Sequence, residues 1–167
     1  EAELLLNGKQ IGERKPYDDS TAIIYWDIPY TPGTLEVVAY NRGKKVAEDK
    51  IQSSGLPYAI RASMDKIQDV KVGEVLHLMI QIVDENNIPV VLADNQITCY
   101  IEGEAKLLGL ESGDHNVADN YRDNKQRCKN GKLLGYVKVR GQGKVKIRLT
   151  SPLLQSAVLE LDVKSYK

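Results

Sequence analysis

Alternation of apolar residues with mostly polar ones is the feature that most restricts how this chain can fold. The clearest stretch alternates between two sets of residues: Leu76, Leu78, Ile80 and Ile82 on one side, and His77, Met79, Gln81 and Val83 on the other. The same period of two runs through residues 145–149 and 159–163. Because successive side chains of a strand point to opposite faces, the pattern predicts strands with one buried face.

Turn-forming residues separate these runs at a spacing of roughly 8–12 residues, which is typical of β-sandwiches. The strongest signal is Asn7-Gly8, since a two-residue type I′ hairpin turn needs positive φ at both positions. No window of helical periodicity is longer than about two turns. The sequence therefore predicts an all-β fold made of two tandem immunoglobulin-like antiparallel β-sandwich domains.

The stretch from Ser53 to Pro57 has the small, polar and Pro/Gly composition of a linker. We therefore expect one module at 1–55 and a second at 56–167. The first piece offers five strands, at 2–6, 9–12, 21–28, 34–41 and 45–52. An immunoglobulin sandwich needs about seven, and the chain opens inside an alternating run. We expect a fragment of a longer chain whose first module is N-terminally truncated.

The formal net charge is zero, from 23 basic and 23 acidic side chains. This balance argues against a nucleic-acid partner, because neutralising phosphates requires a basic surplus. The longest apolar runs, four or five residues, are too short to span a bilayer. Cys99 and Cys128 fit neither a CxxC motif nor a zinc spacing. We expect two separate buried thiols, with a disulfide between them as the alternative.

Two sequence segments carry a resemblance to a known family. Residues 2–9 (AELLLNGK) and 26–40 (WDIPYTPGTLEVVAY) are similar to the patterns VELFLNGK and WxVPYxPGxLxAVAY. Those patterns belong to the domain that follows the catalytic barrel in bacterial β-galactosidases of glycoside hydrolase family 2. Residues 108–114 (LGLESGD) and 127–132 (RCKNGK) resemble the GxxNGD loop and RxAFxG stretch of the next immunoglobulin-like module in these enzymes.

The resemblance implies C-terminal, non-catalytic modules without a cofactor or metal. A retaining glycosidase needs two carboxylates about 5–5.5 Å apart, which this family carries on a barrel of about 250 residues. The sequence shows no such pair. The implied partners are the rest of the glycosidase chain and, beyond it, a carbohydrate or a second subunit. The implied location is periplasmic or secreted.

Three features are candidates for contacts with sugar or a partner. The loop 111–124 is rich in oxygen ligands, with Asp114, His115 and Asn116 as its candidates. Calcium favours such oxygens, yet Asn and Asp also dominate loops for turn geometry alone, and we favour the structural interpretation. Tyr25 and Tyr30 are candidate sugar-stacking rings. Trp26 lies in an alternating run and is expected in the core.

The third feature is a basic ladder. A hairpin predicted at 133–150 would place five cations on one face: Lys138, Arg140, Lys144, Lys146 and Arg148. Its functional interpretation is an anionic partner, with Lys144, Lys146 and Arg148 as contacts. The alternative, which we favour, is pairing with Glu160 and Asp162 across neighbouring strands.

Two other functions remain open at this point. A carbohydrate-binding module would show an exposed row of aromatic side chains. A bacterial surface adhesion domain of immunoglobulin type would show repeated modules, but the WDIPY segment has no counterpart after residue 57.

Overall fold

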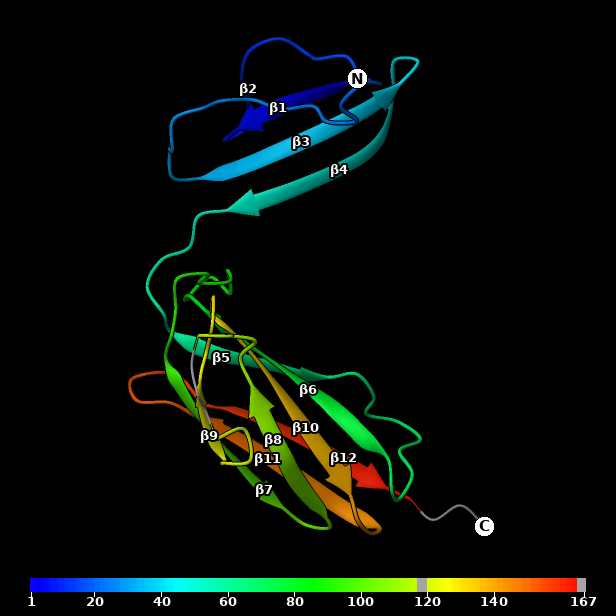
Figure 1. Cartoon of the computed structure of the whole chain (residues 1–167), viewed down its shortest axis with the longest axis vertical. Helices are drawn as coiled ribbons and strands as arrows, with labels where there is room; N and C mark the ends of the chain where they lie inside the picture. The colour runs from blue at the N-terminus through cyan, green and yellow to red at the C-terminus, as the bar shows by residue number, and fades with distance from the viewer. Residues whose placement is uncertain (117–119, 165–167) are drawn as a thin grey trace. The chain divides into compact units, whose positions relative to one another are not determined.

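The computed structural model describes residues 1–116 and 120–164, and these ranges contain twelve β-strands and no helix (Figure 1). The contacts within the chain separate it into two compact units, Glu1–Ser53 and Ser54–Lys167. The predicted all-β class is confirmed. All pairings between the twelve strands of the described residues are antiparallel, and one isolated parallel bridge joins Ala59 to Gln155.

The first unit is a single four-stranded sheet. Its strand order is β2 (Lys9–Gln10), β1 (Ala2–Leu6), β3 (Thr34–Asn41) and β4 (Lys44–Gln52). Asn7 and Gly8 connect β1 to β2 with φ angles of 52° and 77°. Both angles are positive, so the tight hairpin turn predicted from the Asn-Gly pair is confirmed.

The strand predicted at 21–28 is wrong. This segment lies between β2 and β3 and forms no ladder. Ile24, Trp26 and Ile28 are half-buried and the residues between them are exposed. The alternation therefore reflects a segment with one partly covered side and one exposed side. Alternation predicts which side chains are covered, but a strand also needs a neighbouring backbone to pair with.

The core of the first unit is small. Only Ala2, Leu4 and Val38 are buried in it, with 5–7% of each residue still exposed, and every residue of β4 is exposed. A single sheet of this size has no second layer to cover its apolar face.

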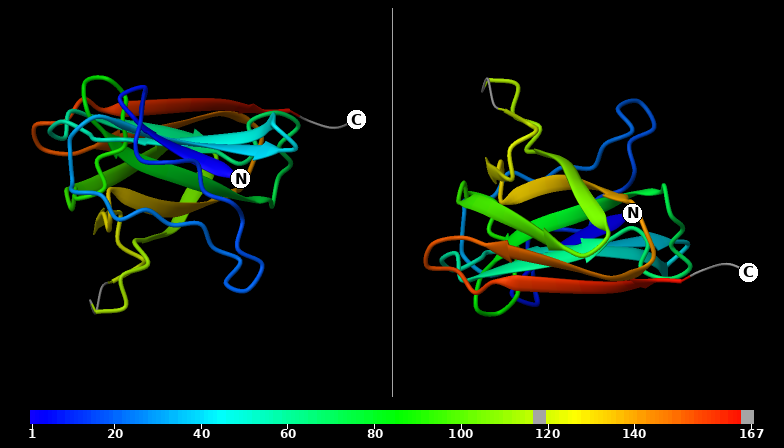
Figure 2. Two further views of the ribbon diagram at one scale, coloured as in Figure 1. Left: turned by 90° about the horizontal axis from the view of Figure 1, so that it is seen from above. Right: turned by 90° about the horizontal axis from the view of Figure 1, so that it is seen from below.

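The second unit is a sandwich of two four-stranded sheets (Figures 1 and 2). The first sandwich sheet has the order β5 (Ala59–Met64), β6 (Val75–Val83), β10 (Lys132–Val139) and β8 (Ala105–Glu111). The second sandwich sheet has the order β12 (Ala157–Val163), β11 (Gly143–Thr150), β7 (Gln96–Glu102) and β9 (Lys125–Arg127). With β9 set aside, this is the ABED and CFG arrangement of an immunoglobulin fold.

The inward faces of the two sandwich sheets form one hydrophobic core. The predicted alternation of β6 is confirmed, because its inward residues are all buried: Leu76, Leu78, Ile80 and Ile82. Val145, Ile147 and Leu149 of β11 face them from the other sheet and are equally buried. Of the opposite set on β6, His77 and Met79 are exposed and Gln81 is half-buried, whereas Val83 at the end of the strand is buried.

The hairpin predicted at 133–150 is wrong. It corresponds to β10 and β11, which belong to different sheets. Both strands have a buried apolar face, and each face needs the other as its cover. The connection at 140–142 therefore carries the chain across the sandwich rather than back along one sheet. Lys138 and Arg148 consequently lie on opposite outer faces.

Cys99 and Cys128 are both free and buried, which confirms the expected pair of separate thiols. Burial raises the pKa of each thiol to about 12. A thiol that stays protonated is unreactive. These two side chains therefore act as small apolar groups of the core.

Candidate functional site

The predicted aromatic contacts lie in the first unit. Tyr25 and Tyr30 are 67% and 82% exposed. The Nζ of Lys15 lies 5.1 Å from the ring centre of Tyr25 and 5.5 Å from that of Trp26, within the range of a cation–π contact. Trp26 is half-buried, and it is not among the fully buried side chains of the core. A lysine of the same unit thus already occupies the space beside two of these rings.

The loop after β8 is organised by Asp114. Its carboxylate accepts hydrogen bonds from Nζ of Lys129 at 3.0 Å and from the backbone N–H of Asn116 at 3.1 Å. The Lys129 ammonium, followed by the Asn116 N–H, holds the pKa of Asp114 below its usual range. His115 and Asn116 are exposed. Positions 117–119 of the predicted loop lie outside the described residues, and the described part contains no group of three His, Cys, Asp or Glu side chains that could hold a metal ion.

The basic residues of β11 face acidic neighbours. Lys146 lies opposite Glu160 on one side and Glu102 on the other, with its Nζ 3.7 Å from the Glu160 carboxylate. Lys144 lies opposite Asp162. The charges of this outer face are therefore largely matched within the sheet, as cross-strand pairs of opposite charge favour.

Arg148 completes the same face in a different way. Its guanidinium carbon lies 4.5 Å from the centre of the Tyr100 ring on β7. This is a cation–π contact across two paired strands. Lys146 and Arg148 thus have partners on the neighbouring strands, and Lys144 lies opposite an acidic residue.

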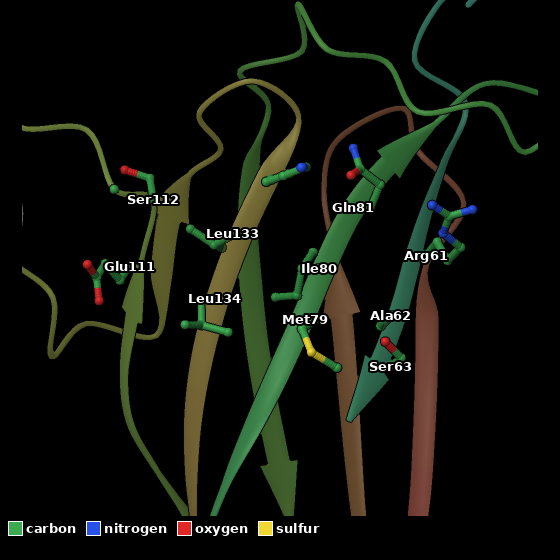
Figure 3. A pocket seen from close by; sticks show the side chains of 12 residues that line it. Arg61, Ala62, Ser63, Met79, Ile80, Gln81, Glu111, Ser112, Leu133 and Leu134 are labelled. Carbon is green, nitrogen blue, oxygen red and sulfur yellow. The ribbon is translucent and has the colours of Figure 1, made fainter. Parts of the chain in front are cut away.

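A hollow of about 700 Å³ lies on the outer face of the first sandwich sheet (Figure 3). Its lining comes from β5, β6, β10 and β8 and from the start of the loop after β8. We call this hollow the sheet groove. The side chains that give it its chemistry are Arg61, Ser63, Met79, Gln81, Glu111, Lys132 and Leu134.

One row of the sheet groove is polar and cationic. Strand register places Gln81 between Arg61 on β5 and Lys132 on β10. The Nε2 of Gln81 donates to the carbonyls of Gly131 at 3.0 Å and Ile82 at 3.2 Å. Its amide is thereby fixed in place, with the side-chain oxygen left as an acceptor.

The next row forms an apolar floor. Register aligns Ser63, Met79, Leu134 and Glu111 across the four strands. Met79 is 40% exposed, and Met79 and Leu134 lie side by side between the polar ends (Figure 3). The floor therefore places two apolar side chains between polar ones on an outer sheet face.

A third row closes the floor with aromatic side chains. The rings of His77 and Tyr136 meet edge to face, with centres 5.5 Å apart. The hydroxyl of Tyr136 donates to Oε2 of Glu111 at 3.0 Å, and this bond raises the pKa of Tyr136. Nδ1 of His77 lies 2.6 Å from Oδ2 of Asp65. Burial alone would raise the pKa of Asp65, but the hydrogen bonds from His77 outweigh it and that pKa lies below its usual range.

A second hollow of about 460 Å³ adjoins the sheet groove through Glu111. Tyr121, Tyr136 and Leu108 line it, and Tyr121 is 48% exposed. Sequence reasoning missed both hollows. The outward set of β6 was visible as an alternation, but nothing in the sequence indicated which strands would lie beside it.

Comparison with known proteins identifies the family of the chain. Residues 60–160 match the family model described as glycoside hydrolase family 2 C-terminal domain 5. The chain belongs to that family. Residues 1–47 match a second model, described as a domain of unknown function, DUF4982. The predicted resemblance to a C-terminal module of glycoside hydrolase family 2 is thereby confirmed.

The relatives of this C-terminal domain are much longer chains. A β-galactosidase of Bacteroides ovatus, BoGH2A, is 30% identical over 163 residues, which are 96% of this chain and 19% of that protein. A β-glycosidase structure from Bacteroides vulgatus is 30% identical with a TM-score of 0.90, over 97% of this chain and 21% of the other. A family 2 member from Bacteroides cellulosilyticus matches at 26% identity and a TM-score of 0.90, over 98% and 21%. The chain spans about a fifth of the length of these relatives.

The described residues include no helix that could cross a membrane.

Proposed function

We propose that this chain is the non-catalytic C-terminal part of a β-galactosidase-like glycoside hydrolase, in which it supports the catalytic barrel. One observation carries the proposal. The chain aligns over nearly its whole length with a β-galactosidase and a β-glycosidase while covering only about a fifth of each. Both units are sheets, and rigid sheets are suited to holding loops and neighbouring domains in place.

The pairing of the acidic side chains agrees with this role. Glu111 accepts from Tyr136, Asp65 lies against His77, and Asp114 accepts from Lys129. Each carboxylate thus has a partner that keeps it in one position. In a glycosidase the two reacting carboxylates face the substrate together.

An assay of the chain by itself tests the catalytic part of the proposal. We expect no release of 4-nitrophenol from 4-nitrophenyl β-galactoside or β-glucuronide above the rate without protein. A saturable, protein-dependent rate would overturn the non-catalytic assignment.

Deletion of residues 54–167 from the longer protein tests the supporting role. We expect a lower thermal midpoint, with kcat for a small aryl glycoside unchanged in the fraction that stays folded. A large fall in kcat at an unchanged thermal midpoint would mean that the region acts in the chemistry. The implied periplasmic or secreted location is part of the same proposal, and fractionation of the native cells tests it.

A further inference from the structure

The sheet groove is pre-formed. Its floor is the outer side of strands whose inner sides are locked in the core: Leu78 of β6 and Val137 of β10 are fully buried. The second hollow shares Glu111 with it, and the two hollows have volumes of about 700 and 460 Å³. Small-molecule sites are concave and about 300–1,000 Å³ in volume. The size fits a ligand of a few linked rings.

The floor suits the apolar face of a pyranose ring. Met79 and Leu134 are adjacent in the sheet groove, and Tyr121 and Tyr136 continue the surface into the second hollow. Sugars stack on such rings and side chains through their C–H faces, while their hydroxyls stay free to make hydrogen bonds. A ligand that lies along the strands' outer face would meet both parts.

Polar groups with spare hydrogen-bonding capacity surround this floor. Oε1 of Gln81 is oriented by the two bonds that its amide nitrogen makes. Tyr136 binds Oε2 of Glu111, which leaves Oε1 of that carboxylate as an acceptor. The hydroxyl of Ser63 has no partner among the described residues. These groups match what the hydroxyls of a sugar can donate and accept.

Two cations at one end of the sheet groove indicate the charge of the ligand. Arg61 and Lys132 flank Gln81, and neither forms an ion pair within the described part of the chain. Arg61 reaches only Asn87, at 3.4 Å. On the opposite sheet, by contrast, the cations Lys144 and Lys146 lie beside acids of the same sheet.

We propose that the sheet groove binds an oligosaccharide that contains a uronic acid. Its carboxylate lies between Arg61 and Lys132, where charge-assisted hydrogen bonds are strongest. The neighbouring sugar lies over Met79 and Leu134. This site does not depend on whether the longer protein is a β-galactosidase.

Isothermal titration of the 167-residue chain at about 150 mM salt, where long-range charge attraction is screened, tests the site. The probes are tetragalacturonate and its fully methyl-esterified form, an uncharged sugar with the same linkages. We expect tetragalacturonate to bind about tenfold or more tightly than the ester, because only the former places a carboxylate between the two cations. The double variant Arg61→Ala/Lys132→Ala should lose that preference.

A matched control removes the same charge elsewhere. Lys144→Ala/Lys146→Ala changes the second sandwich sheet and should bind within about twofold of the parent, because those cations lie beyond the range of unscreened attraction. Leu134→Glu puts a carboxylate on the floor and should abolish binding of both sugars. Circular dichroism establishes that each variant is folded.

Three results would overturn the proposal. The first is no binding of either sugar, and the second is equal loss in the Arg61/Lys132 variant and in the control. The third is binding of polyglutamate as tightly as tetragalacturonate, which would show a general attraction for anions in place of a sugar site.

Discussion

Truncation of Leu78 tests how the sandwich core is held. Its side chain is 0% exposed and lies at the centre of β6. Leu→Ala at such a site removes buried methyl groups and leaves a cavity, at a cost of about 2–5 kcal/mol in the free energy of unfolding. Gly135, opposite Leu78 on β10, sets the shape of that cavity. A Cβ added to Gly135 would lie 3.3 Å from both Cβ and Cδ2 of Leu78 and 3.2 Å from Cδ2 of Leu110.

Gly135→Ala by itself therefore overpacks the core, at about 1–3 kcal/mol. In the double variant the added methyl enters space that Leu78→Ala has opened. We expect the double variant to lose less free energy of unfolding than the sum of the losses in the two single variants, by at least about 0.5 kcal/mol. Urea unfolding followed by far-ultraviolet circular dichroism measures all three variants.

The control is Leu92→Ala, where the side chain is 92% exposed and the cost should stay within about 0.5 kcal/mol. Strict additivity of Leu78→Ala and Gly135→Ala would refute the reasoning, since the Leu78 side chain and the methyl group added at Gly135 would then not share one packing space. A cost of Leu78→Ala below about 1 kcal/mol would refute it as well.

Three further predictions concern individual residues of the second unit. The backbone N–H of Gly55, followed by N–H groups of the turn after β6, holds the pKa of Asp84 below its usual range. This carboxylate therefore stabilises the fold above about pH 4 and loses that effect as the pH falls through its lower folded pKa. In an acid titration, Asp84→Asn should lose less stability than the parent chain. Cys99 and Cys128, with thiol pKa values of about 12, should react with Ellman's reagent at pH 8 only after denaturant is added, and fast reaction of the folded chain would contradict their burial. Gly131→Ala should destabilise strongly, because φ is +70° and the added Cβ would lie 2.3 Å from a backbone oxygen. Gly113→Ala, at φ +72° with no atom within 4 Å of the added Cβ, carries only the backbone strain. Equal midpoints of thermal unfolding for the two variants would show that the contact at Gly131 is not restrictive.

The local sequence predicted those features that depend on a single strand or a single turn. Asn7-Gly8 specifies its own backbone angles, and the alternation of β6 identifies the buried side without reference to the rest of the chain. The family resemblance was equally local, because it rests on short motifs such as residues 2–9 and 26–40. These are the features that the structure and the comparisons bear out.

Pairing between distant strands lay beyond the sequence. The alternation at 21–28 is the same as that of a strand, yet no neighbouring backbone pairs with it. β10 and β11 have the pattern of a hairpin, but each needs the other sheet as cover. An alternating pattern carries no information about which strand lies alongside, since any apolar face can cover any other.

The sequence by itself determined that this chain is an all-β member of a glycosidase family, with buried faces readable from the alternation. Only the tertiary structure decided how charges and polar groups meet. It places Lys146 beside Glu160 and Glu102, and it brings Arg61 and Lys132 from strands about 70 residues apart in sequence to either side of Gln81. The physical reason is that hydrogen bonds between strands act over a few ångströms of space, whereas the residues that they align are distant along the chain.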